Sequence, residues 1–293
     1  MGRCSAPDRF ERSALRKKMH ELRASAPAPP ARAWSLEEGK GPLAAHVLRR
    51  GDIHKRGKRV DPGTPAFLGV AGPGPNNRLG LARWLTEPGH PLTARVVVNR
   101  MRLCNAVGAD PDGATMAWQR HGGTVTRAQP RGIVTPGTVY DHCDGLWSDQ
   151  PGRAMLLLTA DCLPIAVARS GGTRPAVEIL HAGWRGLLAG IVAAGVRAVR
   201  PGRLTAAIGP SIGPCCYEVG EEVASPFRQA FGDDVVRDGT LDLWTAAERA
   251  LRAAGVEDVE RFDLCTACNG ERFFSHRRDH AKTGRQGVIA YIN

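Results

Sequence analysis

The sequence predicts a mixed α/β protein, an α+β sandwich in which helices flank a central mixed sheet behind an irregular, basic N-terminal extension. From about residue 115 onward, apolar runs of strand length alternate with segments of helical periodicity, which is typical of an α/β fold. Residues 1–100 differ, because they hold eleven of the 21 prolines. The two parts of the chain are therefore expected to be organised differently.

The first third contains few regular elements. Residues 1–25 have helical periodicity, and the prolines of APAPPAR (26–32) end any helix there. The segment VDPGTPAFLGVAGPGPNN (60–77) is rich in Pro and Gly and predicts an irregular loop. Two further helices are expected, a short one over 78–85 and a longer one over 92–108.

The remaining two thirds supply the predicted sheet and its helices. Strands are expected at 116–121, 154–160, 163–170, 175–183, 204–212, 261–266 and 287–292, and helices at 187–199 and 241–256. The last helix is amphipathic, with Asp242 in its first turn and Gly255 near its end.

Composition restricts the class of protein. The chain has 293 residues, 42% of them hydrophobic, and no apolar run long enough to span a bilayer. The N-terminus is charged and has no apolar core of a secretory signal, which indicates a cytoplasmic protein. The eight cysteines are then expected to be reduced, so that metal binding or catalysis is favoured over disulfides.

The net charge of +11 is confined to the first third. Residues 1–100 hold 19 basic and 8 acidic side chains, a difference of +11, and the remaining 21 and 21 cancel. The segment HKRGKR (54–59) has the charge to contact phosphates, but no aromatic side chains are interleaved for stacking on bases. A solvated loop is therefore favoured over a nucleic-acid site.

The segment TADCLPIAVA (159–168) places a carboxylate and a thiol inside an apolar run, where an ionised carboxylate needs a partner. His181 ends another apolar run, and His121 follows a third. If strand ends gather at one edge of the sheet, Cys162 and the two histidines can meet there. Three such ligands leave a fourth position of zinc open, as in catalytic sites. Spacing alone leaves open a buried thiol beside two loop histidines.

The motifs QRHGGTV, DGLWSDQPG, TADCLPIAVA, HAGWRGLLAGIV, AIGPSIGPCCYEVGEEV and CTACNGERFFSHRRDHAKTGRQ occur in this order. Over residues 97–293 the chain thereby resembles the YfiH-like family, formerly called multicopper polyphenol oxidase or laccase-domain proteins. The resemblance implies a zinc-dependent purine nucleoside phosphorylase that acts on adenosine, inosine, guanosine and methylthioadenosine and also deaminates adenosine. It implies that His121, Cys162 and His181 bind Zn²⁺ and that the partners are nucleosides and phosphate.

Other positions gain roles from this resemblance. Arg185 is expected either to bind phosphate at a helix start or to pair with Asp161. Asp161 is expected to orient a metal-bound histidine or to accept a hydrogen bond from the nucleoside. Ser275, Arg278 and Arg285 are candidates for substrate binding, although His276 replaces the tyrosine of the family's FFSYRRD segment.

Cys265 and Cys268 form a CTAC motif, which suggests either a redox pair or half of a zinc site. Cys215 and Cys216 have the chemistry of the other half, but adjacent cysteines seldom both reach one metal. The interpretation favoured here is four structural thiols.

The N-terminal part does not resemble the same family. Residues 36–100 resemble an unrelated bacterial domain of unknown function, and the family's own N-terminal strands are not recognisable. Two regions are therefore predicted, an extension over 1–98 and a YfiH-like domain over 99–293. Three alternatives stay open: a copper-dependent phenol oxidase, a hydrolase that edits peptidoglycan precursors, and an inactive fusion.

Overall fold

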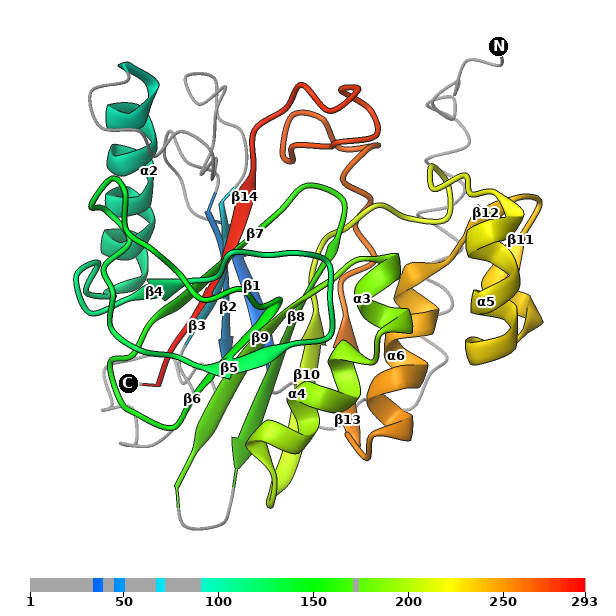
Figure 1. Ribbon diagram of the computed structural model, residues 1–293, viewed down its shortest axis with the longest axis horizontal. Helices are drawn as coiled ribbons and strands as arrows, with labels where there is room; N and C mark the ends of the chain where they lie inside the picture. Colours follow the sequence, from blue (N-terminus) through cyan, green and yellow to red (C-terminus); the bar gives the residue numbers. More distant parts are fainter. Residues whose placement is uncertain (1–33, 39–44, 51–66, 72–90, 171–173, 293) are drawn as a thin grey trace. The chain divides into compact units, whose positions relative to one another are not determined.

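The computed structural model describes residues 34–38, 45–50, 67–71, 91–170 and 174–292 (Figure 1). The helices predicted over 1–25 and 78–85 and the basic segment 54–59 lie outside the described residues.

In the described part of the chain, two six-stranded sheets replace the single sheet that was predicted. The first has the order β1 (Trp34–Glu38), β2 (Ala45–Arg50), β3 (Phe67–Ala71), β14 (Gln286–Ala290), β7 (Met155–Thr159) and β4 (Thr115–Met116). The second has the order β13 (Asp258–Arg261), β10 (Arg203–Ile208), β8 (Leu163–Ser170), β9 (Ala176–Ala182), β6 (Gly145–Ser148) and β5 (Val125–Arg127). Both sheets combine parallel and antiparallel pairs, so the mixed α/β class is confirmed.

Helices cover the outer face of each sheet. The helices are α2 (Pro91–Val107), α3 (Trp184–Leu188), α4 (Ile191–Val199), α5 (Glu221–Phe231) and α6 (Leu243–Ala253), with a 3₁₀ turn η1 (Asp233–Val235) and a ribbon of β11 (Val236–Arg237) and β12 (Thr240–Leu241) after α5. Of these, α5 packs against α3 and α6. In Figure 1, α2 lies beside the first sheet, and α3, α4 and α6 lie beside β8–β10. None of the helices in the described ranges is long and apolar enough to cross a bilayer.

Side-chain alternation explains why each sheet buries both faces. On the first sheet, Leu156, Leu158 and Ile289 pack toward α2, so their neighbours along the strands face the second sheet. On the second sheet, Leu163 and Ile165 belong to the cluster that packs against α3, α4 and α6. Burying apolar side chains on both faces is the main stabilising contribution in such a layered fold.

The helix predicted over 187–199 is divided in two. Gly190 has a φ of 77°, a left-handed conformation that glycine adopts without steric cost, and it separates α3 from α4. The short α3 thereby positions Trp184 and Arg185 independently of α4. The prediction for α6 is confirmed, since the Asp242 carboxylate accepts a hydrogen bond from the Thr245 N–H at 3.0 Å and caps the helix.

Three predicted segments differ from the structure. The chain leaves the sheet after Met116 instead of continuing as a strand to 121, because backbone N–H groups near His121 bond to a side chain rather than to a strand. The strand expected at 261–266 lies earlier, at Asp258–Arg261. The irregular loop predicted over 60–77 is wrong for Phe67–Ala71, which pairs as β3 with β14. Pairing there satisfies backbone groups that an open edge would leave exposed.

The predicted division of the chain between residues 98 and 99 falls inside α2, which continues from Pro91 to Val107. The division itself stays a prediction.

One buried carboxyl group in the second sheet has a measurable consequence. Glu178 in β9 is fully buried, and its oxygens have no hydrogen-bond partner in the described structure, so burial raises its pKa well above 4.5. The folded protein keeps the proton that the unfolded chain releases, and the free energy of unfolding therefore falls as pH rises, by about 1.4 kcal/mol per pH unit. Glu178→Gln is expected to remove this decline in urea unfolding measured from about pH 5 to about pH 8. Equal slopes for both proteins would contradict the burial of an uncharged carboxyl.

Candidate active site

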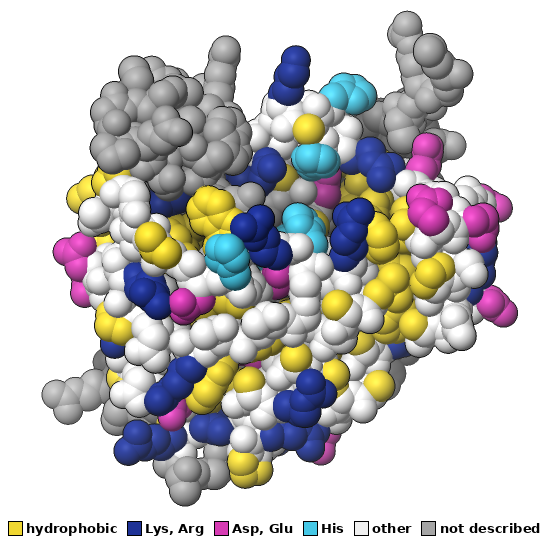
Figure 2. Space-filling view, in the orientation of Figure 1, with side chains coloured by type: hydrophobic (Ala, Val, Ile, Leu, Met, Phe, Trp, Pro, Cys, Tyr) yellow, Lys and Arg dark blue, Asp and Glu magenta, His cyan; other side chains and the backbone are white. Residues whose placement is uncertain are grey.

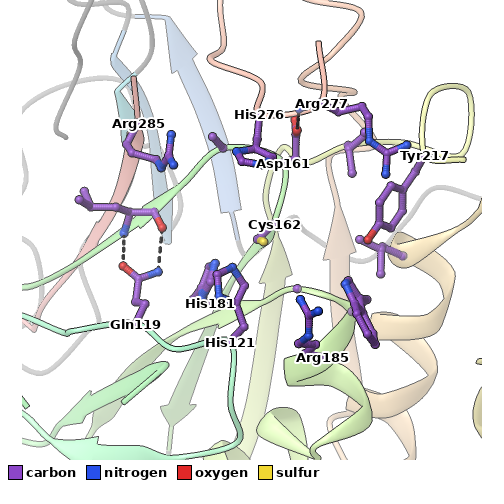
Figure 3. Close-up of a pocket in the computed structure, with 16 residues that line it drawn as sticks. Gln119, His121, Asp161, Cys162, His181, Arg185, Tyr217, His276, Arg277 and Arg285 are labelled. Carbon is purple, nitrogen blue, oxygen red and sulfur yellow. Dashed lines mark hydrogen bonds between the residues drawn. The ribbon is translucent and has the colours of Figure 1, made fainter. Parts of the chain in front are cut away.

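The three side chains predicted as metal ligands converge. The ligating atoms of His121, Cys162 and His181 all lie within 4.8 Å of one another. The two imidazole rings meet edge to face, with their centroids 4.8 Å apart (Figure 3). Among the described residues, no fourth side chain with a ligating atom joins this group. The donor set therefore fits a metal ion with one coordination position open, as zinc has in catalytic sites.

The β8–β9 pair explains how Cys162 and His181 meet. The strands are antiparallel, with Leu163 opposite Ala182 and Pro164 opposite His181. Cys162 precedes the start of β8, and His181 lies at the end of β9, so both fall at the same end of the pair. Cys162 also follows the carboxyl end of β7, as the sequence predicted, but β7 and β9 belong to different sheets.

Asp144, which no motif in the sequence indicates, holds the two histidines in place. Its buried carboxylate accepts hydrogen bonds from the backbone N–H groups of Arg120, His121 and Gly122, at 2.7–3.1 Å. Its Oδ1 also lies 2.9 Å from His181 Nδ1. A carboxylate on the second nitrogen of a metal-binding imidazole fixes the ring and its tautomer. Asp144 thus fixes His181 through its ring and His121 through its backbone.

Gln119 fixes the loop that precedes His121. Its side-chain amide donates to the Leu158 carbonyl at 2.7 Å and accepts from the Leu158 N–H at 3.0 Å, as the dashed lines in Figure 3 show. This pair of bonds joins the loop to β7. In the sequence Gln119 is only a polar residue near a candidate ligand, and the fold is needed to reveal its partner.

Two residues of the site have backbone conformations that L-amino acids rarely adopt. His121 has a φ of 60°, and Asp161 has a φ of 86°. Each such conformation costs of order 1–3 kcal/mol and persists only where neighbouring contacts hold it. The Asp144 carboxylate supplies such contacts for His121. Hydrogen bonds from Thr266 Oγ1 at 2.6 Å and from the Arg277 N–H at 2.7 Å supply them for Asp161.

These contacts revise the expectation for Asp161. Its carboxylate is occupied by Thr266 and Arg277, while His181 has Asp144 as its partner. Asp161 therefore does not orient this histidine. In the described structure it also makes no ion pair with Arg185, so the expected alternative of such a pair is wrong.

Charges within the ligand group favour a thiolate. Burial alone would raise the pKa of the Cys162 thiol, but the positive charge of His181 and hydrogen bonds with both histidines outweigh burial and lower this pKa to about 6. Burial opposes protonation of His181, yet Cys162 and Asp144 raise its pKa to about 9. The sulfur is thus prepared to bind a cation, because the thiolate is the form that ligates metals.

Gly183 keeps the space beside the sulfur clear. A Cβ at this position would lie 2.9 Å from Cys162 Sγ and 3.4 Å from His121 Cδ2. The first distance is below any normal contact, so a side chain here would displace a ligand. Gly183, the first glycine of HAGWRG, is therefore required because the backbone approaches the ligands closely at this position.

The ligand group opens into a cavity of about 400 Å³. Figure 2 shows His and Lys/Arg side chains gathered on the upper central part of this face. The cavity is lined by the three ligands and by Gln119, Leu158, Ala160, Asp161, Gly183, Trp184, Arg185, Ile212, Tyr217, Leu243, His276, Arg277 and Arg285. Its size lies within the range of sites for small molecules.

Only some of the residues predicted to bind substrate line the cavity. Arg185 and Arg285 line it, together with His276 and Arg277. Ser275 and Arg278 do not: Ser275 is fully buried, and the Arg278 guanidinium bonds to Asp279 and to backbone carbonyls. Both side chains stabilise the turn that carries their neighbours, and substrate contacts for Ser275 and Arg278 stay a prediction.

The three lining arginines differ in their partners. Arg277 donates to the Glu218 carbonyl at 2.8 Å, and Arg285 donates to the carbonyls of Thr283 and Gly284. The Arg185 guanidinium lies over the Trp184 ring, 4.2 Å from its centroid, and donates no hydrogen bond to any described residue. Its N–H groups are therefore available to an anionic ligand.

Comparisons with known proteins agree with this fold and site. The sequence model of a family described as "Multi-copper polyphenol oxidoreductase laccase" matches residues 91–293. The chain is 35% identical over 235 residues to "Purine nucleoside phosphorylase YlmD" of Geobacillus stearothermophilus, covering 74% of this chain and 77% of that protein. It is 34% identical over 206 residues to "Purine nucleoside phosphorylase YfiH" of Escherichia coli K12, covering 66% of this chain and 79% of that protein.

Solved structures give the same result. The crystal structure of YlmD from Geobacillus stearothermophilus superposes with a TM-score of 0.68 at 28% identity, covering 91% of this chain and 98% of that one. That of the hypothetical protein YfiH from Bacillus licheniformis superposes with a TM-score of 0.68 at 27% identity, covering 80% of this chain and 98% of that one. In sequence and in fold, the chain belongs to the family of YfiH and YlmD, whose sequence model bears the laccase description.

Proposed function

We propose that this protein is a zinc-dependent purine nucleoside phosphorylase that acts on adenosine, inosine, guanosine and methylthioadenosine and also deaminates adenosine. The single observation that carries the proposal is the convergence of His121, Cys162 and His181 in a cavity whose wall also presents Arg185. The names of the relatives YlmD and YfiH, both called purine nucleoside phosphorylases, support the same activity.

The metal would be held by the two imidazoles and the thiolate, with Asp144 fixing the rings. When bound, zinc supplies a Lewis acid that polarises a substrate atom. The thiolate and the Asp144 carboxylate would place negative charge near the ion, and Gln119 and Asp144 keep the loop of His121 in position. These residues thereby prepare the site before substrate enters.

Phosphate would bind to Arg185. A guanidinium binds two phosphate oxygens at once, and its N–H groups make no other hydrogen bond among the described residues. Arg185 lies in α3, which is only five residues long, so phosphate binding is assigned to the side chain and not to the helix terminus.

The purine would lie against the apolar wall. Ile212, Tyr217 and Leu243 line the same cavity and offer flat or aliphatic surface to a base. Tyr217 remains a neutral phenol, because burial raises its pKa to about 12. An uncharged hydroxyl at this position can donate a hydrogen bond to a heteroatom of the base.

In phosphorolysis, a phosphate oxygen forms a bond to the ribose C1′ carbon while the bond from C1′ to the base nitrogen breaks. The electron pair of that bond leaves with the base, which takes up a proton, and the products are free base and ribose 1-phosphate. Arg185 would hold the phosphate near C1′, which supplies the positioning that such a displacement needs. In deamination, water replaces the amino group of adenosine, and ammonia leaves.

The direct test is phosphate-dependent release of hypoxanthine from inosine by the zinc-loaded protein. Hypoxanthine is expected only when phosphate is present, together with an equal amount of ribose 1-phosphate. Release of hypoxanthine at the same rate without phosphate would reject the proposal. So would the absence of free base from all four nucleosides.

The laccase description of the family favours one second candidate, a copper-dependent phenol oxidase. Two imidazoles and one thiolate also suit copper. Protein loaded with copper and protein loaded with zinc should therefore be compared for phenol oxidation and for inosine cleavage. Phenol oxidation that requires copper, without cleavage of inosine in either form, would favour the oxidase.

Arg185→Ala is expected to raise the KM for phosphate by about 10- to 100-fold, because a hydrogen bond to a charged group is worth about 1.5–3 kcal/mol. The KM for inosine should change much less. The measurement is initial rate against phosphate concentration, with Arg197→Ala on the exposed side of α4 as a matched control. An unchanged KM for phosphate in Arg185→Ala would show that another group binds the anion.

A further inference from the structure

Four cysteines outside the active site come together in a second cluster. The sulfur atoms of Cys215, Cys216, Cys265 and Cys268 all lie within 4.8 Å of one another. Cys268 Sγ is 3.4 Å from both Cys215 Sγ and Cys216 Sγ. Adjacent cysteines seldom both reach one metal, and for this reason the sequence alone favours structural thiols. Here a tight turn brings both of them to the same partner.

The spacing of the sulfurs matches a tetrahedral metal site. With zinc–sulfur bonds of about 2.3 Å, the edge of a regular tetrahedron of sulfur atoms is about 3.8 Å. The 3.4 Å contacts and the 4.8 Å upper limit bracket this value, so small shifts of the side chains would complete the coordination. Four thiolates with two residues between Cys265 and Cys268 are typical of structural zinc.

The backbone holds the two halves of the cluster in register. The Gly213 carbonyl accepts hydrogen bonds from the N–H groups of Cys216 and Tyr217, both at 3.0 Å, which closes the first turn. The Cys265 carbonyl accepts from the N–H and the side-chain amide of Asn269, which closes the second. The Gly213 N–H points at Cys265 Sγ at 3.3 Å, a bond that stabilises a thiolate sulfur.

The two turns are also docked to each other and to the segment that follows. The Ser211 carbonyl accepts from the Thr266 N–H at 2.9 Å, which joins the two segments. The Arg278 guanidinium, which pairs with Asp279, also donates to the carbonyls of Thr266 and Ala267 within the CTAC turn. Arg278, predicted from sequence to bind substrate, therefore holds this turn in place.

From this arrangement we infer that Cys215, Cys216, Cys265 and Cys268 bind a second metal ion, a structural zinc with four thiolate ligands. Binding displaces the four thiol protons to solvent and breaks no covalent bond between heavy atoms. The site joins two segments that are 50 residues apart in sequence, counted from Cys215 to Cys265. It goes beyond the proposed function, since it requires no nucleoside chemistry.

The second ion would stiffen one wall of the cavity. Tyr217 follows Cys216 directly and lines the cavity. Thr266 follows Cys265 and holds Asp161, beside the ligand Cys162, through its hydroxyl group. The cluster thus fixes both segments from outside the site and leaves the open coordination position of the first metal untouched.

Metal stoichiometry tests the inference without any activity assay. Protein produced with zinc and dialysed is expected to hold two zinc ions per chain, and the variants Cys162→Ser and Cys268→Ser one each. Cys104→Ala, which removes a buried thiol outside both clusters, should keep two. After cobalt exchange, the single ion in Cys162→Ser should show the thiolate charge-transfer absorption and intense visible bands of a tetrahedral site with four sulfurs.

The key variant is Cys162→Ser, because it keeps the second cluster intact, and its result stands even if Cys268→Ser does not fold. A Cys162→Ser protein without zinc would overturn the inference, as would a cobalt spectrum with fewer sulfur ligands. Loss of two hydrogens in the intact mass of fresh protein would also overturn it, since that indicates a disulfide. Each result holds whether or not the protein cleaves nucleosides.

Discussion

Replacing Cys162 with alanine is expected to remove one zinc ion per chain and to reduce phosphate-dependent cleavage of inosine to the background of the assay. The thiolate is the anionic member of the ligand group, and its low pKa of about 6 reflects how well the site stabilises negative charge there. Replacing a residue that only hydrogen-bonds to a metal ligand lowers metal affinity or activity by about 10- to 100-fold. Loss of a ligand itself should lower them by more than about 100-fold. Zinc content after dialysis and hypoxanthine release measure the two effects.

The matched control is Cys104→Ala, since Cys104 is a buried thiol of α2 that packs in the core between this helix and the first sheet. This change should lower the melting temperature through a small cavity and leave both zinc content and cleavage intact. Equal zinc content and equal rates in Cys162→Ala and the unaltered protein would rule out the His121–Cys162–His181 site.

Replacing Asp144 with asparagine should weaken zinc binding by about 10- to 100-fold and also destabilise the fold. An asparagine has the same shape, but one carboxylate oxygen becomes an NH₂ group that faces backbone N–H donors. Breaking a buried charged network costs roughly 3–5 kcal/mol. Competition with a chromogenic chelator measures the affinity, and urea unfolding measures the stability.

The effect of Asp144 has a defined pH range. Burial would raise the pKa of this carboxyl, but His181 and the backbone N–H groups outweigh burial and lower it below 3.8. Its stabilisation is therefore complete above the ordinary pKa of an aspartate and is lost as pH falls through the lowered value. The difference in the free energy of unfolding between the unaltered protein and Asp144→Asn should shrink in acid.

The matched control is Asp149→Asn, which alters an exposed ion pair with Arg127 and should change stability by no more than about 0.5 kcal/mol. A similar small loss in Asp144→Asn would contradict the role assigned to Asp144.

Much of the fold was predictable because it depends on local pattern. The strand at Leu163–Ser170 and the helix capped by Asp242 follow directly from apolar periodicity and a capping side chain. The division into two sheets was not predictable, because the strands that pair are distant in sequence: β14 pairs with β7 and with β3. The break at Gly190 was missed because a single glycine within a helical pattern is usually tolerated.

The site divides in a similar way. His121, Cys162 and His181 were identified from motifs whose residue types are restricted by metal chemistry. Asp144 was missed because a carboxylate before a strand has no distinctive spacing, and its importance comes from five converging contacts in space. The clustering of the four cysteines could not be predicted, because it depends on the turn at Gly213 that brings Cys215 and Cys216 to the same partner. Ser275 and Arg278 were candidates for substrate binding through the resemblance of their segment to the family. They do not line the cavity, whereas His276 and Arg277 between them do, because neighbours along a loop can face opposite ways.

The antiparallel register of β8 and β9 has one more consequence. A slip of one residue between these strands would send His181 to the opposite face of the sheet and separate it from Cys162. An ion held by both side chains is therefore compatible with a single alignment of the hairpin. Binding of a metal ion would therefore favour the correctly paired hairpin, since chains with shifted strands would lack one ligand and the binding energy that it supplies.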